Sequence, residues 1–586
     1  GDFRYMAWQA SLTDILNLKL LPGEFDLFLE SWKENYKTIE DFNRASGTNF
    51  KSWDEITQND LHKIKHINPC LLGFRDELNR KYKSIEVLNS AWKSSFSSFE
   101  DITDEEIQKL KQQGKYGGQL DKIWYLEDLF IKNMEAASRG VKEVSNEIGV
   151  GQGAASFGNI IPEVLQFLDS AIPYEGARDL EVIRSVPHRY CGHTIGVYGG
   201  KAVSSAVREN QPWHVLFTGG NFIWFWSMIT GGLDGDLSMN PNRSGIMLKN
   251  IQEMQKGVAR ALIQSERQHD GIAILHSRRS GELSGILKTM GTVFSSEIAF
   301  QNIIEDLGMQ YRYTWTDEIE RGILRTGEFK VLILPYAQIV SEREILEIKN
   351  FVKQGGMVIA DLRTGTHDWY GNPLENGALD EIFGVKISGS DISPLSGTMV
   401  WHTDLSGTPF EKPGSITGIH CDGSVKQEKA ISLCSIGNSP CVFINRYGNG
   451  TAIFLNFSPT SYNFLLNRNE ADTLRNLYRK IFILGGVERK FKVLSKKGED
   501  VKGVETAIFK NGDITYLTIE KHPLEFEKYP IPGYIFLNRN YEAYDLRKMK
   551  KIGWTDRIPV EFTGLGCYVY SLLPYKVKDI RVQMNS

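Results

Sequence analysis

Four short apolar stretches succeed one another in the first half of the chain, and each is followed by a loop and a segment of helical period. They cover residues 150–157, 167–174, 192–198 and 214–228. Short apolar strands that alternate with helices are typical of parallel βα units rather than of hairpins. The pattern therefore predicts four successive strands of a parallel sheet, preceded by a long amphipathic helix over residues 120–147.

A second rhythm begins at residue 271. The runs GIAILHS, YRYTW, FKVLILP and MVIAD are continuous rather than alternating, as expected for parallel strands that are covered on both faces. A helix is predicted over SEREILEIKNFVKQ, and Gly355 and Gly356 end it. This stretch predicts an open, doubly wound α/β sheet of the flavodoxin or class I amidotransferase type.

The final part of the chain, from Val487 onward, changes pattern again. The segments ETAIFK, DITYLTIE and CYVYSLLP alternate apolar and polar positions and are separated by Gly and Pro turns. Alternation with a period of two is typical of antiparallel strands that bury one face. We expect a small antiparallel β-sandwich here.

A duplicated helical unit lies near the start of the chain. Residues 27–56 and 73–102 match at an offset of 46 positions. Each copy predicts a helix, a second short helix and a turn before an aromatic, acidic end. A scaffold role is favoured over a functional one. The matched pairs are Tyr36 and Tyr82, Ile39 and Ile85, Asn43 and Asn89, Ala45 and Ala91, Phe50 and Phe96, and Ile56 and Ile102.

The length and these patterns together predict the domain organisation. The 586 residues exceed the roughly 250 to 300 at which a single core stops growing, so about three domains are expected. A closed (β/α)8 barrel has eight strands and four are predicted here, so the first domain is interpreted as the C-terminal half of a TIM barrel. We expect an upstream half outside this sequence. The predicted domains are 1–268 (late barrel with the helical repeat), 269–486 (doubly wound domain) and 487–586 (β-sandwich).

Composition narrows the class of function. The chain has 41% hydrophobic, 24% charged and 11% aromatic residues, which is ordinary for a globular protein. A formal charge of −4 and a pI near 6.3 leave no broad basic field, so nucleic acid is not expected as a partner. No run approaches the roughly 18 apolar residues of a transmembrane helix, so no membrane partner is expected. Localisation stays open between cytoplasm and secretion, because an export signal would lie in the expected upstream half.

The cysteines limit the chemistry. There are six, without a CxxC pair or a metal-type cluster, and they predict reduced, buried thiols. Neither a metal nor a cofactor is expected. No cysteine occurs between Cys191 and Cys421, which excludes thiol amidotransferase chemistry in the doubly wound domain. That domain also lacks a GxGxxG motif and a P-loop.

Several strings resemble glycoside hydrolase family 42 and its β-galactosidases. The most specific is VLILPYAQIVSEREILEIKNFVKQGGMVIADLRTGTHDWYGNPLENGALDEIFGV, which resembles the β-galactosidase trimerisation domain. The strings AILHSRRS, NFIWFWSM, FRDELNRKYKSIEVLNSAWKSSFSS and NRYGNGTAIFLNFSPTSY also look like that family. The resemblance implies a TIM barrel, a carbohydrate substrate and self-association, with a trimer as the expected oligomer.

Glycoside hydrolysis usually needs two carboxyl groups that flank the bond, one as acid and one as nucleophile or base. The resemblance would place them at the ends of the fourth and seventh barrel strands. The fourth strand is expected upstream, and the predicted seventh strand, CGHTIGVYGG, has no carboxylate. The remaining candidates follow other strands, since catalytic groups of barrels lie at the C-terminal strand ends. They are Glu175, Asp234 and Asp236, for which a solvated loop acid or a turn residue is the alternative.

Candidate sugar-binding residues lie on the same strands. His193 and Tyr198 belong to the predicted seventh strand, although a strand histidine is more often a core group. Trp224 and Trp226 alternate so as to share one face of the predicted eighth strand, and Tyr174 ends the sixth. The resemblance implies a sugar platform at the eighth strand, and core packing is an equal alternative for both tryptophans.

Three functional hypotheses remain open. The first is a glycosidase that acts on β-galactosides or related β-linked oligosaccharides and polysaccharides by a two-carboxylate mechanism. The second is a catalytically silent carbohydrate-binding or oligomeric scaffold, which the missing carboxylate on the seventh strand supports. The third is an enzyme for an anionic polysaccharide. Four basic residues near the predicted strands permit it: Arg178, Arg184, Arg189 and Lys201.

Overall fold

The computed structural model divides the chain into two compact units. Unit 1 comprises residues 1–133 with 370–372, and unit 2 comprises 134–369 with 373–586. The structure describes residues 24–578 apart from 47, 64–68, 154–157, 174–176, 188–189, 197–204, 227–235, 237, 242–244, 288 and 405–414. For residues 193–196 and 224–226 it describes the backbone only.

Unit 1 contains the helical repeat, and both copies fold in the same order of elements. A long helix is followed by a short helix and a single 3-10 turn. The first copy has α3 (Glu24–Tyr36), α4 (Ile39–Ser46) and η1 (Trp53–Glu55), and the second has α5 (Pro69–Tyr82), α6 (Ile85–Trp92) and η3 (Phe99–Asp101). Two further helices follow, α7 (Asp104–Gln112) and α8 (Gly117–Val144), and α8 continues into unit 2.

One asparagine fixes the turn of each copy. The Asn43 side chain donates to the Phe50 carbonyl (2.7 Å) and accepts from the Phe50 amide (2.9 Å). Asn89 makes the same pair of bonds with Phe96, at 2.8 and 2.9 Å. An amide side chain can satisfy a backbone N–H and C=O together, which explains why asparagine is repeated at this position. The turn directs the following apolar residue, Ile56 or Ile102, into the core of its copy.

Unit 2 begins with a parallel sheet of four strands in sequential order, as the apolar stretches predict. Short helices connect the strands, so the segment is a series of βα units. The strands are β1 (Gly151–Gly153), β2 (Ser170–Ile172), β3 (Tyr190–Gly196) and β4 (Phe222–Trp226), and the connecting helices are α9 (Ile161–Val164), α10 (Ala177–Ser185) and α11 (Ser205–Phe217). The strand pairs β1 with β2, β2 with β3, and β3 with β4 are all parallel.

The prediction of a strand over 214–228 is wrong at its beginning. Residues 214–217 form the last turn of α11, and the strand starts at Phe222. Trp213, Leu216 and Phe217 are buried against the C-terminal sheet. Their spacing of three and one fits a helix face, and the apolar run alone could not distinguish it from a strand.

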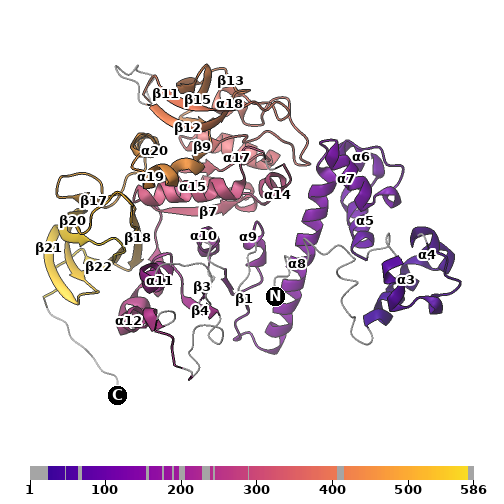
Figure 1. The fold of residues 1–586 in the computed structure, drawn as a ribbon, viewed down its shortest axis with the longest axis horizontal. Helices are drawn as coiled ribbons and strands as arrows, with labels where there is room; N and C mark the ends of the chain where they lie inside the picture. The colour runs from indigo at the N-terminus through magenta and orange to yellow at the C-terminus, as the bar shows by residue number, and fades with distance from the viewer. Residues whose placement is uncertain are drawn as a thin grey trace. The chain divides into compact units, whose positions relative to one another are not determined.

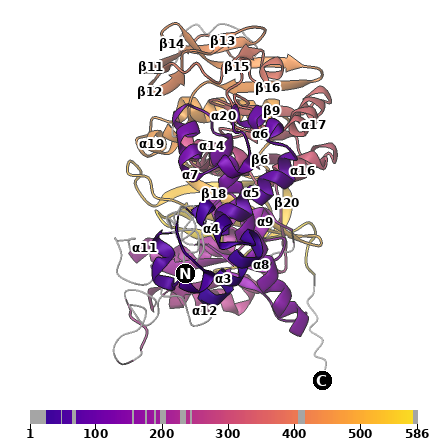
Figure 2. The same ribbon diagram turned by 90° about the vertical axis from the view of Figure 1, so that its right-hand side faces the viewer.

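A nine-stranded sheet follows, and its first part is parallel as predicted. The strands β6 (Ile272–His276), β7 (Tyr311–Trp315), β8 (Val331–Leu334), β9 (Met357–Asp361) and β16 (Gly450–Leu455) are parallel in the order β16-β9-β8-β6-β7. An antiparallel part extends the sheet beyond β16 through β15 (Ser439–Tyr447), β14 (Ile431–Ile436), β11 (Pro394–Trp401) and β12 (Ser415–Asp422). Figures 1 and 2 both show β11, β12 and β15 together at one end of this unit.

Helices cover both faces of the parallel part. On one face, α17 (Glu342–Lys353) packs Ile348 and Val352 on alternate residues of the strands, such as Leu332. On the other face, α20 (Asp472–Leu484) ends at Gly485, where an added Cβ would meet side-chain atoms of Val331 and Met357 at 2.6 and 3.1 Å. Gly355 adopts φ +112° after α17, which releases the chain into β9 as the glycine pair predicts. The doubly wound prediction is therefore confirmed.

The C-terminal strands form an antiparallel sheet. They are β17 (Lys492–Ser495), β18 (Val504–Asn511), β19 (Ile514–Lys521), β20 (Ile531–Asp545), β21 (Lys550–Phe562) and β22 (Cys567–Leu573). The long β20 pairs with β17 in its first half and with β22 in its second, so one strand serves two parts of the domain. The short β5 (Glu266–Arg267), which precedes the doubly wound sheet in the sequence, joins β18 at the edge. No helix among the described residues is long and apolar enough to cross a membrane.

Candidate functional site

The carboxyl edge of the four-stranded sheet is the natural place for a site, because βα loops gather at this end of parallel strands. The register of β3 and β4 is regular: Gly192 pairs with Phe222, Thr194 with Trp224, and Gly196 with Trp226. A Cβ at Gly192 would lie 2.5 Å from the Phe222 ring, so the glycine is required for this close pairing.

The described side chains show which strand positions face the helices. Cys191 is buried with its Sγ 3.6 Å from the Leu180 carbonyl of α10, and Ile223 packs with Met247. Successive residues of a strand alternate between its faces. The positions of Trp224 and Trp226 are therefore out of phase with Ile223. In the same register the backbone of His193 pairs with that of Ile223.

Four predicted site residues lie outside the described residues: Tyr174, Glu175, Tyr198 and Asp234. Their roles stay predictions. The structure does describe their anchors, since β2 ends at Ile172, α10 begins at Ala177 and β3 ends at Gly196.

Asp236 is described and has the contacts of a turn residue. Its carboxylate accepts hydrogen bonds from the Ser238 amide (3.0 Å) and hydroxyl (2.6 Å), and the side chain is exposed. These bonds, first that of the hydroxyl, lower the pKa of Asp236. A carboxyl group that is ionised and bound to its own turn is a poor proton donor at neutral pH.

An ion cluster holds the loops that follow β1 and β2. Arg178, at the start of α10, donates to the Gly158 carbonyl (3.2 Å) and to Glu297 (2.8 Å), and it also pairs with Asp179. Glu297 in turn contacts Nδ1 of His276 at 2.8 Å. Glu297 lies on α15 (Val293–Asp306) and His276 ends β6, so the cluster connects the four-stranded sheet with the doubly wound sheet.

The opposite charges of this cluster compensate one another and hold its members in place. Burial alone would raise the pKa of Glu297, but the charges of Arg178 and His276 more than offset it, so the pKa is lowered. Both Arg178 and Glu297 are almost fully buried. Removal of one member would leave a buried charge uncompensated. The cluster therefore fixes the start of α10, three residues after Glu175.

Two of the arginines expected to bind an anionic substrate form ion pairs within the protein. Arg178 is used in the cluster, and Arg184 pairs with Glu181 and donates to the Tyr311 carbonyl at 3.2 Å. Arg189 and Lys201 lie outside the described residues. The sequence could not show the contacts of Arg178 with Glu297 and of Arg184 with the Tyr311 carbonyl, because each spans more than a hundred positions.

The carboxyl edge of the doubly wound sheet is filled by internal contacts. Asp361, which ends β9, accepts from the Tyr336 amide and the Ser296 hydroxyl. Burial raises the pKa of Asp361 to about 7, although the bond from Ser296 opposes the shift. Tyr336 has φ +45° directly after β8, and its hydroxyl contacts Thr289 at 3.0 Å. A tyrosine with a positive φ thus occupies the turn that follows β8.

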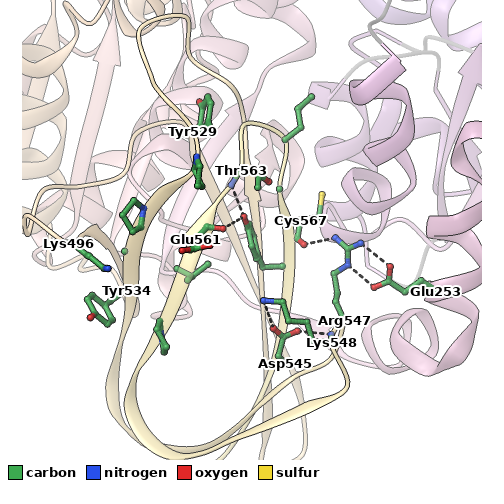
Figure 3. A pocket seen from close by; sticks show the side chains of 18 residues that line it. Glu253, Lys496, Tyr529, Tyr534, Asp545, Arg547, Lys548, Glu561, Thr563 and Cys567 are labelled. Atoms are coloured by element: carbon green, nitrogen blue, oxygen red, sulfur yellow. Dashed lines mark hydrogen bonds and ion pairs between the residues drawn. The ribbon is translucent and has the colours of Figure 1, made fainter.

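A cavity of about 1100 Å³ lies on the C-terminal sheet, along β20, β21 and β22. Figure 3 shows that its charged side chains bind one another: Arg547 holds Glu253 at 2.7 Å and the Cys567 carbonyl at 2.6 Å. Tyr568 donates to the Glu561 carbonyl. The guanidinium of Arg547 and the carboxylate of Glu253 are thus bound to each other within the lining of the cavity.

Among the described residues, one group of three side chains has the arrangement of metal ligands. It consists of His214, Glu505 and Glu520, and it lies between α11 and the C-terminal sheet rather than at the strand edge. The five described cysteines are buried and free, as predicted: Cys191, Cys421, Cys434, Cys441 and Cys567.

The comparison with known protein families gives a match in the middle of the chain. Residues 325–487 match the family described as the β-galactosidase trimerisation domain. No curated protein matches the sequence.

Solved structures extend the likeness to most of the chain. The β-galactosidase of Bacillus circulans sp. alkalophilus has a TM-score of 0.68 at 17% identity, over 86% of this chain and 77% of that chain. The β-galactosidase of Rahnella sp. R3 gives 0.66 at 14% identity, over 86% and 76%. A family 42 exo-carrageenase of Bacteroides ovatus gives 0.51 at 10% identity, over 86% and 63%. The resemblance predicted from the sequence is confirmed, and at these identities it shows a shared fold.

Proposed function

We propose that the chain is part of a glycoside hydrolase that acts on β-galactosides or related β-linked oligosaccharides and polysaccharides at the carboxyl edge of β1 to β4. The observation that supports it most is the backbone register of β3 and β4 at this edge, in which Thr194 pairs with Trp224 and Gly196 with Trp226, two positions apart. Aromatic rings offer flat apolar faces on which sugar rings can lie. The match to the trimerisation domain and the fold shared with β-galactosidases make a galactoside the first substrate to test.

The proposed chemistry uses two carboxyl groups across the glycosidic bond. Glu175 is the first candidate, because it follows β2 at the strand end and precedes the rigidly held start of α10. A catalytic group must be held within a fraction of an ångström, and the cluster around Arg178 would supply that support from the loop's far side. Asp234 is the remaining candidate for the second carboxyl group. Asp236 is less favoured, because its carboxylate is bound within a turn.

The test compares Glu175→Gln with the parent protein on aryl β-galactosides and a panel of β-linked polysaccharides. Loss of an essential carboxyl group should lower kcat by about three orders of magnitude or more. Glu147→Gln, in an exposed loop acid before β1, is the matched control and should retain the parent rate. Equal rates for all three proteins would remove Glu175 from the mechanism while leaving the glycosidase proposal in place.

A second candidate function is a silent carbohydrate-binding or oligomeric scaffold. The observation that favours it is that β3 carries no carboxylate, and that Asp179 and Glu297 are bound to Arg178. This function predicts that the parent protein hydrolyses none of the substrates, yet binds a β-linked oligosaccharide in calorimetry. Trp224→Ala and Trp226→Ala should then weaken binding, and turnover of any substrate would exclude the scaffold.

We also propose that the protein self-associates through the doubly wound domain, with a trimer as the expected oligomer. The match of residues 325–487 to a trimerisation domain supports this. Light scattering coupled to size-exclusion chromatography should give three times the 66.4 kDa chain mass. A monomer across micromolar concentrations would contradict it.

A further inference from the structure

A compact group of histidine and glutamate side chains lies where α11 meets the C-terminal sheet. His214, near the end of α11, has its Nδ1 at 2.9 Å from Oε2 of Glu520 on β19. Glu505 on β18 and Glu520 pair directly across the two strands. Ligand atoms of His214, Glu505 and Glu520 all lie within 4.8 Å of one another.

The two carboxylates are an unfavourable pair without a positive partner. Both are only 8% exposed, and like charges directly opposite one another destabilise a sheet. A third buried carboxyl, Glu305 on α15, lies near them. Its pKa is raised well above its usual range, first by burial and then by the charges of Glu505 and Glu181.

The positive groups that face the carboxylates come from three elements. His214 and His522 approach them, with Nε2 of His522 at 3.3 Å from Oε2 of Glu505. Arg267 on β5 is shared, because its guanidinium binds Glu181 at 2.7 Å. Burial opposes a charge on His214, but Glu520 raises its pKa to about 10, so a proton occupies the group at neutral pH. The charges of His214 and His522 lower the pKa of Glu505 to about 2 against its burial.

We propose that His214, Glu505 and Glu520 form a binding site for one divalent transition-metal cation, such as Zn²⁺. Imidazole nitrogen and carboxylate oxygen are both ligands of Zn²⁺, at about 2.0 to 2.2 Å. The cation takes the place of the proton between His214 and Glu520, so small side-chain movements close the ligands around it. A fourth position stays open for water. His522 does not bind the metal but orients the Glu505 carboxylate, as the partners of metal ligands commonly do.

The three proposed ligands come from two parts of unit 2. The α11 helix lies between β3 and β4 in the sequence, and Glu505 and Glu520 belong to the C-terminal sheet. A cation bound by all three side chains therefore joins the strands of the candidate active site to the last domain. Because it displaces a proton, its affinity rises with pH.

The ligands are far apart in the sequence, which explains why spacing motifs gave no sign of them. The cross-strand register brings Glu505 opposite Glu520, and the fold of α11 adds His214. The site is independent of glycoside hydrolysis. Its failure and the failure of the proposed function are therefore separate outcomes.

The test titrates Zn²⁺ into chelator-treated protein at pH 7.5 by calorimetry, with Co²⁺ absorption as a second reading. We expect one saturable equivalent, and a melting temperature that rises with Zn²⁺. His214→Gln and Glu520→Gln should each raise the Kd by about 100-fold or more, because losing a ligand costs at least as much as losing its outer partner. Both substitutions keep the side-chain size, and circular dichroism of the metal-free variants checks their fold.

The matched control is His269→Gln. His269 also contacts a glutamate, Glu328, at 3.0 Å, but it does not belong to the three-ligand group. This variant should bind Zn²⁺ as the parent does. If Glu520→Gln does not fold, His214→Gln carries the test, because its side chain is 25% exposed at the edge of the cluster. Absence of saturable binding in the parent, or unchanged binding in the folded His214→Gln variant, overturns the proposal.

Discussion

The two copies of the helical repeat have the same turns but different surroundings. In the second copy, Tyr82 and Trp92 are buried and both donate to the Asp121 carboxylate, at 2.5 and 3.1 Å. In the first copy, Tyr36 is equivalent to Tyr82, and its buried hydroxyl has no hydrogen-bond partner among the described residues. Duplication therefore preserved the local fold, and Asp121 of the long helix α8 adds a buried polar network to the second copy.

The contacts of Asp121 indicate that the second copy contributes more than the first to the stability of unit 1. Asp121 also binds Lys81 at 2.9 Å, so one carboxylate satisfies three donors of the second copy. At the offset of 46 positions, residue 121 of α8 corresponds to residue 75 of α5, an arginine whose Nε donates to the Ile102 carbonyl. The first copy is thus stabilised by its hydrophobic core of Trp32, Phe42 and Ile56.

The largest expected effect follows from Asp121→Ala. It leaves the buried Tyr82 hydroxyl without its acceptor, the Trp92 indole with the Tyr82 oxygen alone (3.2 Å), and Lys81 without its partner, so the free energy of unfolding of the second copy should fall by about 3 kcal/mol. Native-state hydrogen exchange of α6 amides measures this. Glu105→Ala, an exposed acid on α7, is the control and should change exchange little. Equal loss of protection in α4 and α6 would show that the copies do not differ in stability.

Asn43→Ala and Asn89→Ala should each have a smaller effect than Asp121→Ala, and the two effects should be equal to each other. Each removes two hydrogen bonds to one backbone residue, so each should lower the opening free energy of its own copy by about 2 kcal/mol. Hydrogen exchange at Phe50 and Phe96 reports the two turns separately. Asn79→Ala, an exposed asparagine of α5, serves as the control. A large effect in only one copy would mean that the shared turn is not used in the same way.

The elements that could be predicted from the sequence are those with a local signal. The runs FKVLILP and MVIAD became β8 and β9, and the paired glycines ended α17, because burial on both faces and a positive φ leave marks in adjacent residues. The end of α11 was missed because a short apolar run fits both a buried strand and a helix. The individual strands of the antiparallel extension from β15 to β12 were not predicted, because residues of mixed burial give no regular alternation.

The candidate site was predictable only in outline. Strand alternation predicts that Trp224 and Trp226 share one side of β4, and this stays a prediction because the structure describes only their backbone. The cluster of Arg178, Glu297 and His276 carried no local signal, because 119 positions separate Arg178 from Glu297. Long-range ion pairs of this kind depend on how the domains pack, which no window of the sequence contains.

The smallest expected effect contrasts Tyr82→Phe with Tyr36→Phe. Removing the Tyr82 hydroxyl breaks its bond to the buried Asp121 carboxylate and should cost about 1.5 kcal/mol of stability in the second copy. The Tyr36 hydroxyl gains no bond in return for its burial, which raises its pKa to about 12. Tyr36→Phe should therefore leave the first copy unchanged or slightly more stable. Both variants keep the ring, so exchange of α4 and α6 amides isolates the hydroxyl. A cost at Tyr36 as large as that at Tyr82 would show that the first copy has a polar partner too, and the contrast between the copies would fall.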